Sequence, residues 1–382
     1  MSTTTTQDTR TTGPWRLGLP GLATLAVCFG FARYGYGLFL PRFQAEFGGS
    51  AGALGAVTSA GYLGGLVALG VVAWSSGRFG ARWPVVFGVG CAAAGMLMIG
   101  LAHGPVLFTI GVVVAGTSPC WVWAPYSDVV EDEVRPAGRR HALAMISTGT
   151  TFGVAVAGAA ALLVTGPGWR AVWIVAAAAA VAVLAWNARA LPGTARTATR
   201  ESVKLFSRPG VGRLLVASAS SGLVGAACWS FAGMAATAAH PGDPRSAPLL
   251  WTLIGLAGAA GLGTGAFVRR AGLRRVYVAA QLVLAGASAL FAVSGWGFAV
   301  VAGVLYGAGF MTGGALLPLW SSALFADHPT RGFSLVIVFN TVGAAIGPAA
   351  FGLVADHAGL PAAFGLMSVL ALVSIAVRPG KE

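Results

Sequence analysis

Apolar stretches long enough to cross a lipid bilayer recur along almost the whole chain, and they constrain its fold more than any other feature. A spanning helix needs about 20 apolar residues, and twelve such stretches alternate with short polar breaks. Only 9% of the 382 residues are charged, against about 25% in soluble domains. The sequence therefore predicts an all-α membrane protein with twelve transmembrane helices. Their expected ranges are 17–41, 52–74, 83–102, 105–126, 142–165, 169–187, 211–236, 247–268, 276–294, 296–323, 333–355 and 361–378.

The basic residues predict the orientation of these helices. With the N-terminus inside the cell, 20 of the 24 Lys and Arg residues fall on the cytoplasmic side, whereas Arg42, Arg170 and Arg245 fall outside. Such an excess marks cytoplasmic loops, so we expect a multi-pass protein of the cell (inner or plasma) membrane with both termini in the cytoplasm. The net charge of +13 does not indicate nucleic-acid binding, because the charges lie in short breaks between apolar runs. The expected surroundings are the lipid bilayer, with the chain as a monomer.

The two halves of the chain carry similar local patterns. Arg78 and Arg82, after the second predicted helix, recur as Arg270 and Arg274 after the eighth, at an offset of 192, and further matches follow at offsets of 193 and 194. A parallel repeat of six helices predicts two bundles with a site between them near the membrane midplane. The expected parts are a disordered cytoplasmic tail at 1–14, a six-helix bundle at 15–187, a cytoplasmic linker at 188–210 and a second six-helix bundle at 211–382.

Three motifs resemble the major facilitator superfamily (MFS). "SGRFGAR" and "RRAGLRR" resemble its loop motif Gly-x-x-x-Asp-Arg-x-Gly-Arg-Arg, and "GAAIGPAAFG" is similar to its Gly-x-x-x-Gly-Pro helix motif. "FARYGYGLFLPRFQAEFG" resembles a poorly characterised bacterial branch of the family. The resemblance covers residues 15–378. It implies the MFS fold and a secondary transporter of a small molecule, with helices 1, 4, 7 and 10 lining the cavity.

The chain departs from the family where the cytoplasmic ends of the bundles are latched. The acid of the loop motif falls on Gly77 in the first half and on Arg269 in the second. "DVVEDEVRPAGRR" is similar to a family acid–arginine relay, since three of its acids precede an arginine by seven residues, or two helical turns; the alternative is a solvated charged loop. The expected gating residues are Arg78, Arg82, Asp128, Asp132, Glu133, Arg135, Arg139, Arg140, Arg270 and Arg274.

Arg33 is the one ionisable residue that falls well inside a predicted helix, and no acidic residue lies within ten positions of it. Burying a charge at depth costs at least ~2.5 kcal/mol, and arginine does not release its proton to avoid that cost. Its side chain must therefore face acceptors inside the protein. Three roles fit: bidentate binding of an anionic substrate, a structural tie to backbone carbonyls, tyrosine hydroxyls and water, or gating.

Aromatic residues on the expected cavity helices together suggest walls for a small organic anion, although a ring of this kind taken singly is more often a packing or lipid-facing residue. Pro119 removes a backbone hydrogen bond and so frees a carbonyl nearby. Asn340 is a polar side chain in an apolar span. The expected substrate-binding residues are Arg33, Tyr34, Tyr36, Trp121, Trp123, Trp229, Phe231, Tyr306, Phe310 and Asn340.

The sequence contains no catalytic motif, metal-ligand set or nucleotide-binding loop. We therefore expect no enzymatic activity, no metal and no cofactor. The predicted function is secondary transport of a small organic solute, anionic by the evidence of Arg33, through alternating access between two bundles. Two alternatives stay open: an exporter of hydrophobic drugs or metabolites, and a membrane sensor or assembly protein that has the same fold without transporting.

Overall fold

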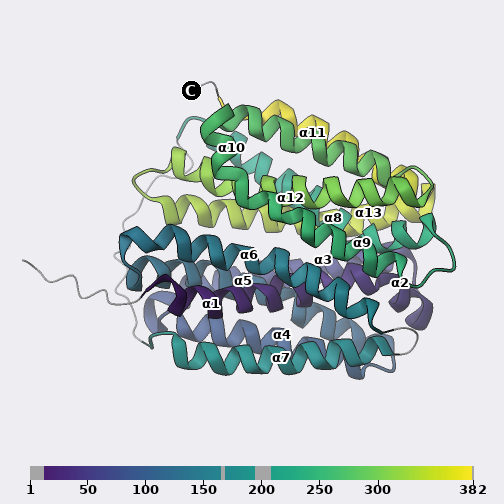
Figure 1. Ribbon diagram of the computed structural model, residues 1–382, viewed down its shortest axis with the longest axis horizontal. Coiled ribbons are helices and arrows are strands. Elements are labelled where there is room, and N and C mark those ends of the chain that lie inside the picture. Colours follow the sequence, from purple (N-terminus) through teal and green to yellow (C-terminus); the bar gives the residue numbers. More distant parts are fainter. Residues whose placement is uncertain (1–12, 165–167, 194–207, 381–382) are drawn as a thin grey trace, which may run out of the picture.

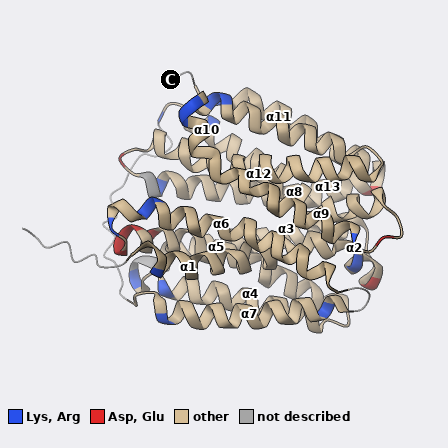
Figure 2. Ribbon diagram, viewed as in Figure 1, with Lys and Arg blue, Asp and Glu red and all other residues tan. Residues whose placement is uncertain are grey.

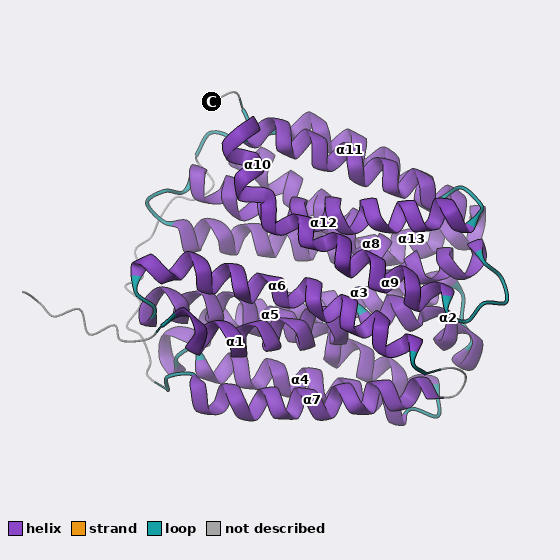
Figure 3. Ribbon diagram, in the orientation of Figure 1, coloured by secondary structure: helices purple, strands orange, loops and turns teal. Residues whose placement is uncertain are grey.

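The computed structural model describes residues 13–164, 168–193 and 208–380. Helices make up almost all of this part, and no strand occurs in it (Figure 3). The long helices run roughly side by side (Figure 1). Their bounds are α1 Pro14–Leu25, η1 Ala26–Arg33, α2 Gly35–Phe47, α3 Ala51–Phe79, α4 Arg82–Leu101, α5 Pro105–Glu133, α6 Pro136–Leu162, α7 Trp169–Ala190, α8 Val211–Ala239, α9 Ser246–Ala257, η4 Gly258–Gly263, α10 Thr264–Ala271, α11 Leu273–Phe291, α12 Trp296–Leu324, α13 Pro329–Val373 and η5 Ser374–Val377.

Eleven helices in the described residues are long and apolar enough to cross a membrane. The last of them, Arg331–Val377, covers all but the first two residues of α13, which has 45 residues. At 1.5 Å per residue α13 would measure about 68 Å, more than twice the ~30 Å of a hydrocarbon core. Gly359 interrupts it with φ 84° and ψ 163°, in the positive-φ region that favours glycine. The arm of α13 that follows Gly359 corresponds to the range predicted for the twelfth span, and its crossing of the membrane stays a prediction.

The first span contains a widened turn. Residues 26–33 form the π-helical segment η1, and the Tyr34 N–H donates to the carbonyl of Phe29, five residues back, at 3.1 Å. Segments of this kind inside α-helices are rare and occur frequently at functional sites. Arg33 is the last residue of η1, so its partly buried guanidinium projects from this irregular turn.

Helix α5 is longer than predicted, and this corrects one sequence interpretation. The acidic stretch 128–133 continues α5, and α6 begins at Pro136. The seven-residue spacing therefore does not place acids and arginines two turns apart on one helix, because Arg135 and the arginines that follow belong to the next helix. The Arg139 Nε donates to the Val134 carbonyl at 3.0 Å and closes this corner.

Most inter-helix contacts stay within one half of the chain, and three helix pairs provide most of those between the halves. Helix α4 packs on α5 and α7, and α8 packs on α13. In Figure 1, α1, α4 and α7 lie in the lower part and α11 and α12 in the upper part. The halves meet mainly where α2 packs on α8, α3 on α13 and α6 on α9.

Charged residues lie toward the ends of the helices (Figure 2). Most Lys and Arg residues gather where α1, α4 and α11 begin, and we call this the basic end. The opposite end holds Glu46 and Asp356. This separation follows the predicted sidedness of the chain, whose orientation in a membrane stays a prediction.

The predicted tail and linker lie largely outside the described residues, at 1–12 and 194–207. Where the chain resumes, the Arg208 Nη2 contacts the Asp327 Oδ2 at 2.7 Å, in the loop before α13. The hydrogen bond and charge of Arg208 lower the pKa of the Asp327 carboxyl.

Candidate functional site

Arg33 is bound to a backbone carbonyl of α5. Its Nε and Nη2 donate to the Gly116 carbonyl at 3.2 and 2.6 Å, and Nη2 lies 3.4 Å from the Cys120 Sγ. None of the described carboxylates pairs with it. Contact with a backbone carbonyl matches the structural role considered from the sequence. It leaves Nη1 without a protein acceptor among the hydrogen bonds of the described residues.

Two aromatic rings also contact the guanidinium. Its Cζ lies 4.6 Å from the ring centroid of Tyr62 on α3 and 5.6 Å from that of Phe29 on η1. Such cation–π contacts favour a charge held away from water. A cavity of about 10 Å³ lies between Arg33, Tyr36, Tyr62 and Gly116. This is the size of one water molecule, so an organic solute cannot bind there in this conformation.

Four predicted residues form one aromatic cluster where the junction of η1 and α2 meets α8 and α12; Tyr34, Trp229 and Tyr306 are buried and Phe310 is partly buried. Tyr34 stacks on Trp229 with ring centroids 4.3 Å apart. The Trp229 centroid lies 5.3 Å from that of Tyr306 and 5.6 Å from that of Phe310. The Tyr306 hydroxyl donates to the Gly225 carbonyl at 2.8 Å. The indole N–H of Trp229 is buried without a hydrogen-bond partner. We call Tyr34, Trp229, Tyr306 and Phe310 the central aromatic cluster.

Trp123 lies on the basic side of this cluster. The centroid of its indole lies 6.0 Å from the ring centroid of Phe29 and 6.3 Å from that of Phe333, at the start of α13. Because Phe29 also contacts Tyr34 at 6.3 Å, the ring contacts are continuous from the central aromatic cluster to a contact between the halves.

The other predicted binding residues lie elsewhere. The Tyr36 hydroxyl donates to the Leu54 carbonyl at 2.9 Å, although Tyr36 also lines the cavity beside Arg33. Trp121 packs against Phe87 of α4, with centroids 4.6 Å apart. Phe231 stacks on Phe351 of α13 at 4.5 Å, and the Asn340 Nδ2 donates to the Ser218 carbonyl at 3.2 Å.

Pro119 frees a different carbonyl from the one that Arg33 uses. A proline removes the bond to the carbonyl four residues earlier, which here belongs to Ala115. The Ser118 hydroxyl donates to that carbonyl at 2.7 Å. The acceptor of Arg33 is the next carbonyl along the helix, that of Gly116.

The halves are in close contact toward the opposite end. A methyl group on Gly37 of α2 would collide with the Trp229 carbonyl of α8, and one on Gly352 of α13 with the Ala51 carbonyl of α3. Glycine at these positions therefore allows the helices to touch through their backbones.

Asp356 adds a polar contact between the halves at the same end. Its Oδ1 and Oδ2 accept the backbone N–H groups of Ala51 and Gly52, each at 2.8 Å. These groups belong to the first turn of α3, where helix N–H groups lack intrahelical acceptors and a negative charge is favourable. A carboxylate from the second half thus caps a helix of the first half. We call this contact the Asp356 latch.

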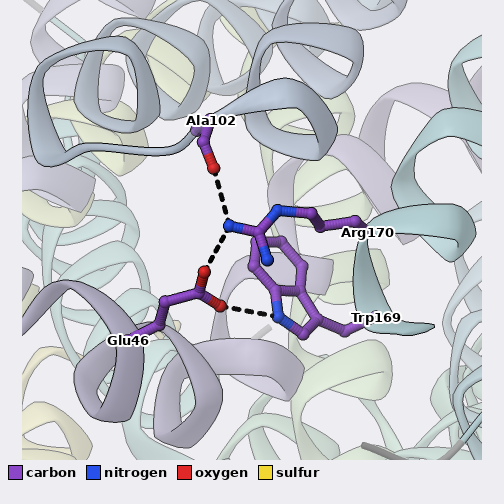
Figure 4. Close-up of polar contacts among 4 residues, drawn as sticks. All are labelled: Glu46, Ala102, Trp169 and Arg170. Carbon is purple, nitrogen blue, oxygen red and sulfur yellow. Dashed lines mark hydrogen bonds and ion pairs between the residues drawn. The ribbon is translucent and has the colours of Figure 1, made fainter. Parts of the chain in front are cut away.

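A second polar group at the opposite end stays within the first half (Figure 4). Arg170 forms an ion pair with Glu46 and donates to the Ala102 carbonyl at 2.8 Å. The other Glu46 oxygen accepts the Trp169 indole N–H at 2.9 Å. The end of α2, the loop after α4 and the start of α7 are thereby joined.

The predicted gating residues all lie at the basic end. The Arg78 guanidinium lies over the Trp74 ring at 4.7 Å, and Arg82 begins α4. Arg270 lies in the last turn of α10 and Arg274 in the first turn of α11. Asp128, Asp132, Glu133 and Arg135 lie around the α5–α6 corner, with Arg139 and Arg140 in the first turns of α6. Their gating role stays a prediction.

Sequence reasoning missed Tyr62, Gly116 and Asp356. The sequence could have pointed to Tyr62, since it is the only tyrosine of the second predicted helix. A carbonyl acceptor such as that of Gly116 has no side-chain signal. Asp356 was excluded because the predicted helix ended at residue 355, whereas α13 continues past it.

Comparison with known proteins identifies relatives for this architecture. Residues 25–378 match the family model described as "Uncharacterised MFS-type transporter YbfB". The nucleoside transporter NupG (D323A mutant) has a similar structure, with a TM-score of 0.75 and 12% identity, covering 94% of this chain and 98% of that one. A bacterial homologue of the human lysosomal transporter Spinster, inward-facing and occupied, gives a TM-score of 0.72 and 15% identity, covering 95% of each chain. No curated protein sequence matches.

Proposed function

The chain belongs to the MFS family described as uncharacterised YbfB-type transporters, and we propose that it moves a small organic anion across the cell membrane by alternating access. Family membership makes it a multi-pass membrane transporter of a small molecule rather than an enzyme, as the sequence predicted. At identities of 12% and 15%, the similarity to NupG and the Spinster homologue indicates a shared fold only. The substrates of those proteins are therefore not assigned to this chain.

The main observation in favour of an anionic substrate is the charge of Arg33, which no described carboxylate balances. Among the described residues it has carbonyl, thiol and aromatic contacts but no carboxylate. A carboxylate or phosphate of the substrate would supply that charge and occupy the free Nη1 donors in a charge-assisted bond. The unpartnered indole N–H of Trp229 offers a second donor in the adjacent central aromatic cluster.

Alternating access is supported by the uneven contacts between the halves. The Asp356 latch and the backbone contacts at Gly37 and Gly352 all lie toward the opposite end. The cavity beside Arg33 holds about 10 Å³, so a solute enters only after the helices around it separate. We therefore propose that this conformation is closed at the opposite end, which is the extracellular side, and that the substrate reaches Arg33 when the two halves rock about the central aromatic cluster.

The proposed transporter has twelve spans in two six-helix bundles, residues 15–187 and 211–382, joined by a cytoplasmic linker at 188–210. The interruption of α13 at Gly359 supports the twelfth span. In this arrangement the basic end faces the cytoplasm, both termini lie there, and the arginines and acids around the α5–α6 corner gate that side. The working unit is a monomer.

One observation favours an exporter of hydrophobic solutes instead. The central aromatic cluster gathers four rings in mutual contact, and Arg33 already has a carbonyl acceptor. In that case Arg33 ties α5 to η1 and the rings alone bind the solute.

Thermal-shift screening of the purified protein against organic acids, followed by uptake into proteoliposomes, tests the proposal. We expect an organic anion to stabilise the wild type and to be transported, while the uncharged analogue does neither. Stabilisation only by neutral hydrophobic compounds would favour the exporter. An absence of flux for every stabilising ligand would favour the sensor.

A further inference from the structure

A groove of about 450 Å³ opens on the surface beside the start of α11, at the basic end. It is lined by Arg274, Arg275, Val278, Ala279 and Leu282 of α11, together with Arg378, which follows η5. The arginines occupy one part of the groove, and the apolar residues continue one to two turns farther along α11. Figure 2 shows basic residues at this corner, next to the C-terminal end of the described chain.

The three arginines line the groove without a pairing carboxylate among the residues that the structure describes. The sequence contains no acidic residue between Asp243 and Asp327. Within the described ranges no ion pair involves Arg274, Arg275 or Arg378. Like charges that converge on one groove repel each other, and an anion placed between them removes that repulsion.

The two walls of the groove are held in fixed positions. The Tyr277 hydroxyl donates to the Ser374 carbonyl at 3.1 Å, and the Tyr277 side chain is buried. This bond joins α11 to the start of η5, four residues before Arg378. Arg378 is therefore positioned across from the first turn of α11 by a buried contact, and does not depend on the last residues of the chain.

The apolar part of the groove faces the surroundings of the protein. Leu282 is 51% exposed, on a helix that is apolar enough to span a membrane. An exposed apolar wall that continues from a cluster of cations matches a molecule with a charged head and a hydrocarbon chain. Basic pockets beside transmembrane helices bind anionic lipid headgroups in this way.

We propose that this groove binds one anionic phospholipid. Arg274, Arg275 and Arg378 hold the headgroup phosphate, and an acyl chain lies along Val278, Ala279 and Leu282. The inference does not depend on what the protein transports, because it concerns a surface outside the central site.

The test measures lipid binding by the full-length protein in detergent. Phosphatidylglycerol is titrated against phosphatidylcholine, and lipids retained by the protein are counted by native mass spectrometry. We expect one phosphatidylglycerol to bind preferentially to the wild type. The triple variant R274Q/R275Q/R378Q should bind it at least roughly tenfold more weakly, which equals about 1.4 kcal/mol. The control R16Q/R189Q/R213Q removes three exposed arginines elsewhere and should remain within about twofold of the wild type.

Two further measurements separate a lipid from a soluble anion. Leu282→Gln should weaken phosphatidylglycerol binding while all the charges remain, and inorganic phosphate should not raise the melting temperature of the wild type. Equal lipid binding by the triple variant and its control would overturn the proposal, as would stabilisation by inorganic phosphate that matches the lipid. If the triple variant fails to fold, the double variant R275Q/R378Q takes its place, because it replaces only exposed side chains. Lipid binding by the double variant equal to that of the control would then overturn the proposal.

Discussion

The phenol ring of Tyr34 lies parallel to the indole of Trp229, with centroids 4.3 Å apart and ring planes 16° apart. Tyr34 joins η1 to α2, and Trp229 belongs to α8. The stack therefore connects the span that carries Arg33 to the second half of the chain. In the proposed alternating-access cycle, we expect the geometry of this pair to change when the halves move.

Replacing Trp229 should impair substrate binding in proportion to the loss of ring surface. A stacked aromatic pair contributes about 0.5–1.5 kcal/mol beyond its area burial. Trp229→Phe keeps a ring but removes the indole N–H, and Trp229→Leu removes both. We expect affinity for the anion found by screening to fall more for Leu than for Phe, as measured by thermal-shift titration.

Trp173→Leu is the matched control, because this fully buried tryptophan packs on Phe31 and Phe39 within the first half. It should lower the melting temperature while leaving ligand affinity within about twofold of the wild type. If Trp229→Leu and the wild type bound the anion found by screening with equal affinity, Trp229 would not be part of the substrate site.

Breaking the Asp356 latch should open the opposite end. Asp356→Ala leaves the N–H groups of Ala51 and Gly52 without their acceptor, so conformations in which α3 separates from α13 become more populated. A cysteine in place of Ser59 reports this opening, since its hydroxyl contacts Ala349 across the two helices at 3.1 Å. We expect an impermeant maleimide to label it several-fold faster in Asp356→Ala than in the otherwise wild-type background.

Asp243→Ala is the control for this experiment. Asp243 lies at the same end, but its carboxylate accepts the Arg245 N–H within its own loop. Labelling should be unchanged in this variant. Equal rates in both variants would show that the latch does not hold the halves together.

The contacts of the cluster show which parts of the site the sequence could have predicted. Residues two apart on a helix point about 200° apart at 3.6 residues per turn, so Tyr34 and Tyr36, Trp121 and Trp123, or Trp229 and Phe231 cannot both face one site. In the structure Tyr34 and Trp229 belong to the central aromatic cluster and Trp123 lies beside it through Phe29, whereas their partners in the three pairs make other contacts. Tyr306 and Phe310 are four apart, lie on one face and are both in the cluster.

The helices themselves were predictable because long apolar runs leave few other folds in a bilayer. The hydrogen-bond register of η1 was not, since a π-turn needs no special residue; the close approach of Gly30 in this segment to the backbone of Gly153 in α6 has no composition signal either. The Asp356 latch joins residues about 300 positions apart, and composition carries no signal for such a contact.

Removing the negative charge of Glu46 should lower stability without changing the substrate site. Glu46→Gln keeps the size of the side chain but loses the ion pair with Arg170. The two side chains are 34% and 24% exposed, so the loss should be about 1 kcal/mol. The melting temperature should fall, while affinity for the anion found by screening stays unchanged. A fall in affinity with an unchanged melting temperature would contradict a purely structural role.

The interruption of α13 predicts the side on which two reporters lie. If both arms cross the membrane, a fusion at residue 359 reports the extracellular side and a fusion after residue 380 reports the cytoplasm. If α13 crossed only once, the two reporters would lie on the same side or in the reverse order. Alkaline phosphatase and green fluorescent protein fusions distinguish these results.

Substitutions of Arg33 decide between an anion site and a structural tie. Arg33→Lys keeps the charge but loses the planar fork that holds a carboxylate. Loss of one charge-assisted hydrogen bond costs about 1.5–3 kcal/mol, or roughly ten- to a hundredfold in affinity. Arg33→Gln should bind still more weakly, because the charge is removed as well. Arg42→Gln is the control, since it removes a cation nearer the end of the same span.

Stability separates the two roles of Arg33. The guanidinium bonds the Gly116 carbonyl and contacts Tyr62, so a purely structural arginine should lower the melting temperature of Arg33→Gln sharply and leave transport by the surviving protein normal. For an anion site we expect the reverse. Because removing a buried charge eases membrane insertion, Arg33→Gln should be abundant, folded and unable to bind the anion. A folded Arg33→Gln with wild-type transport would exclude Arg33 as the anion-binding group.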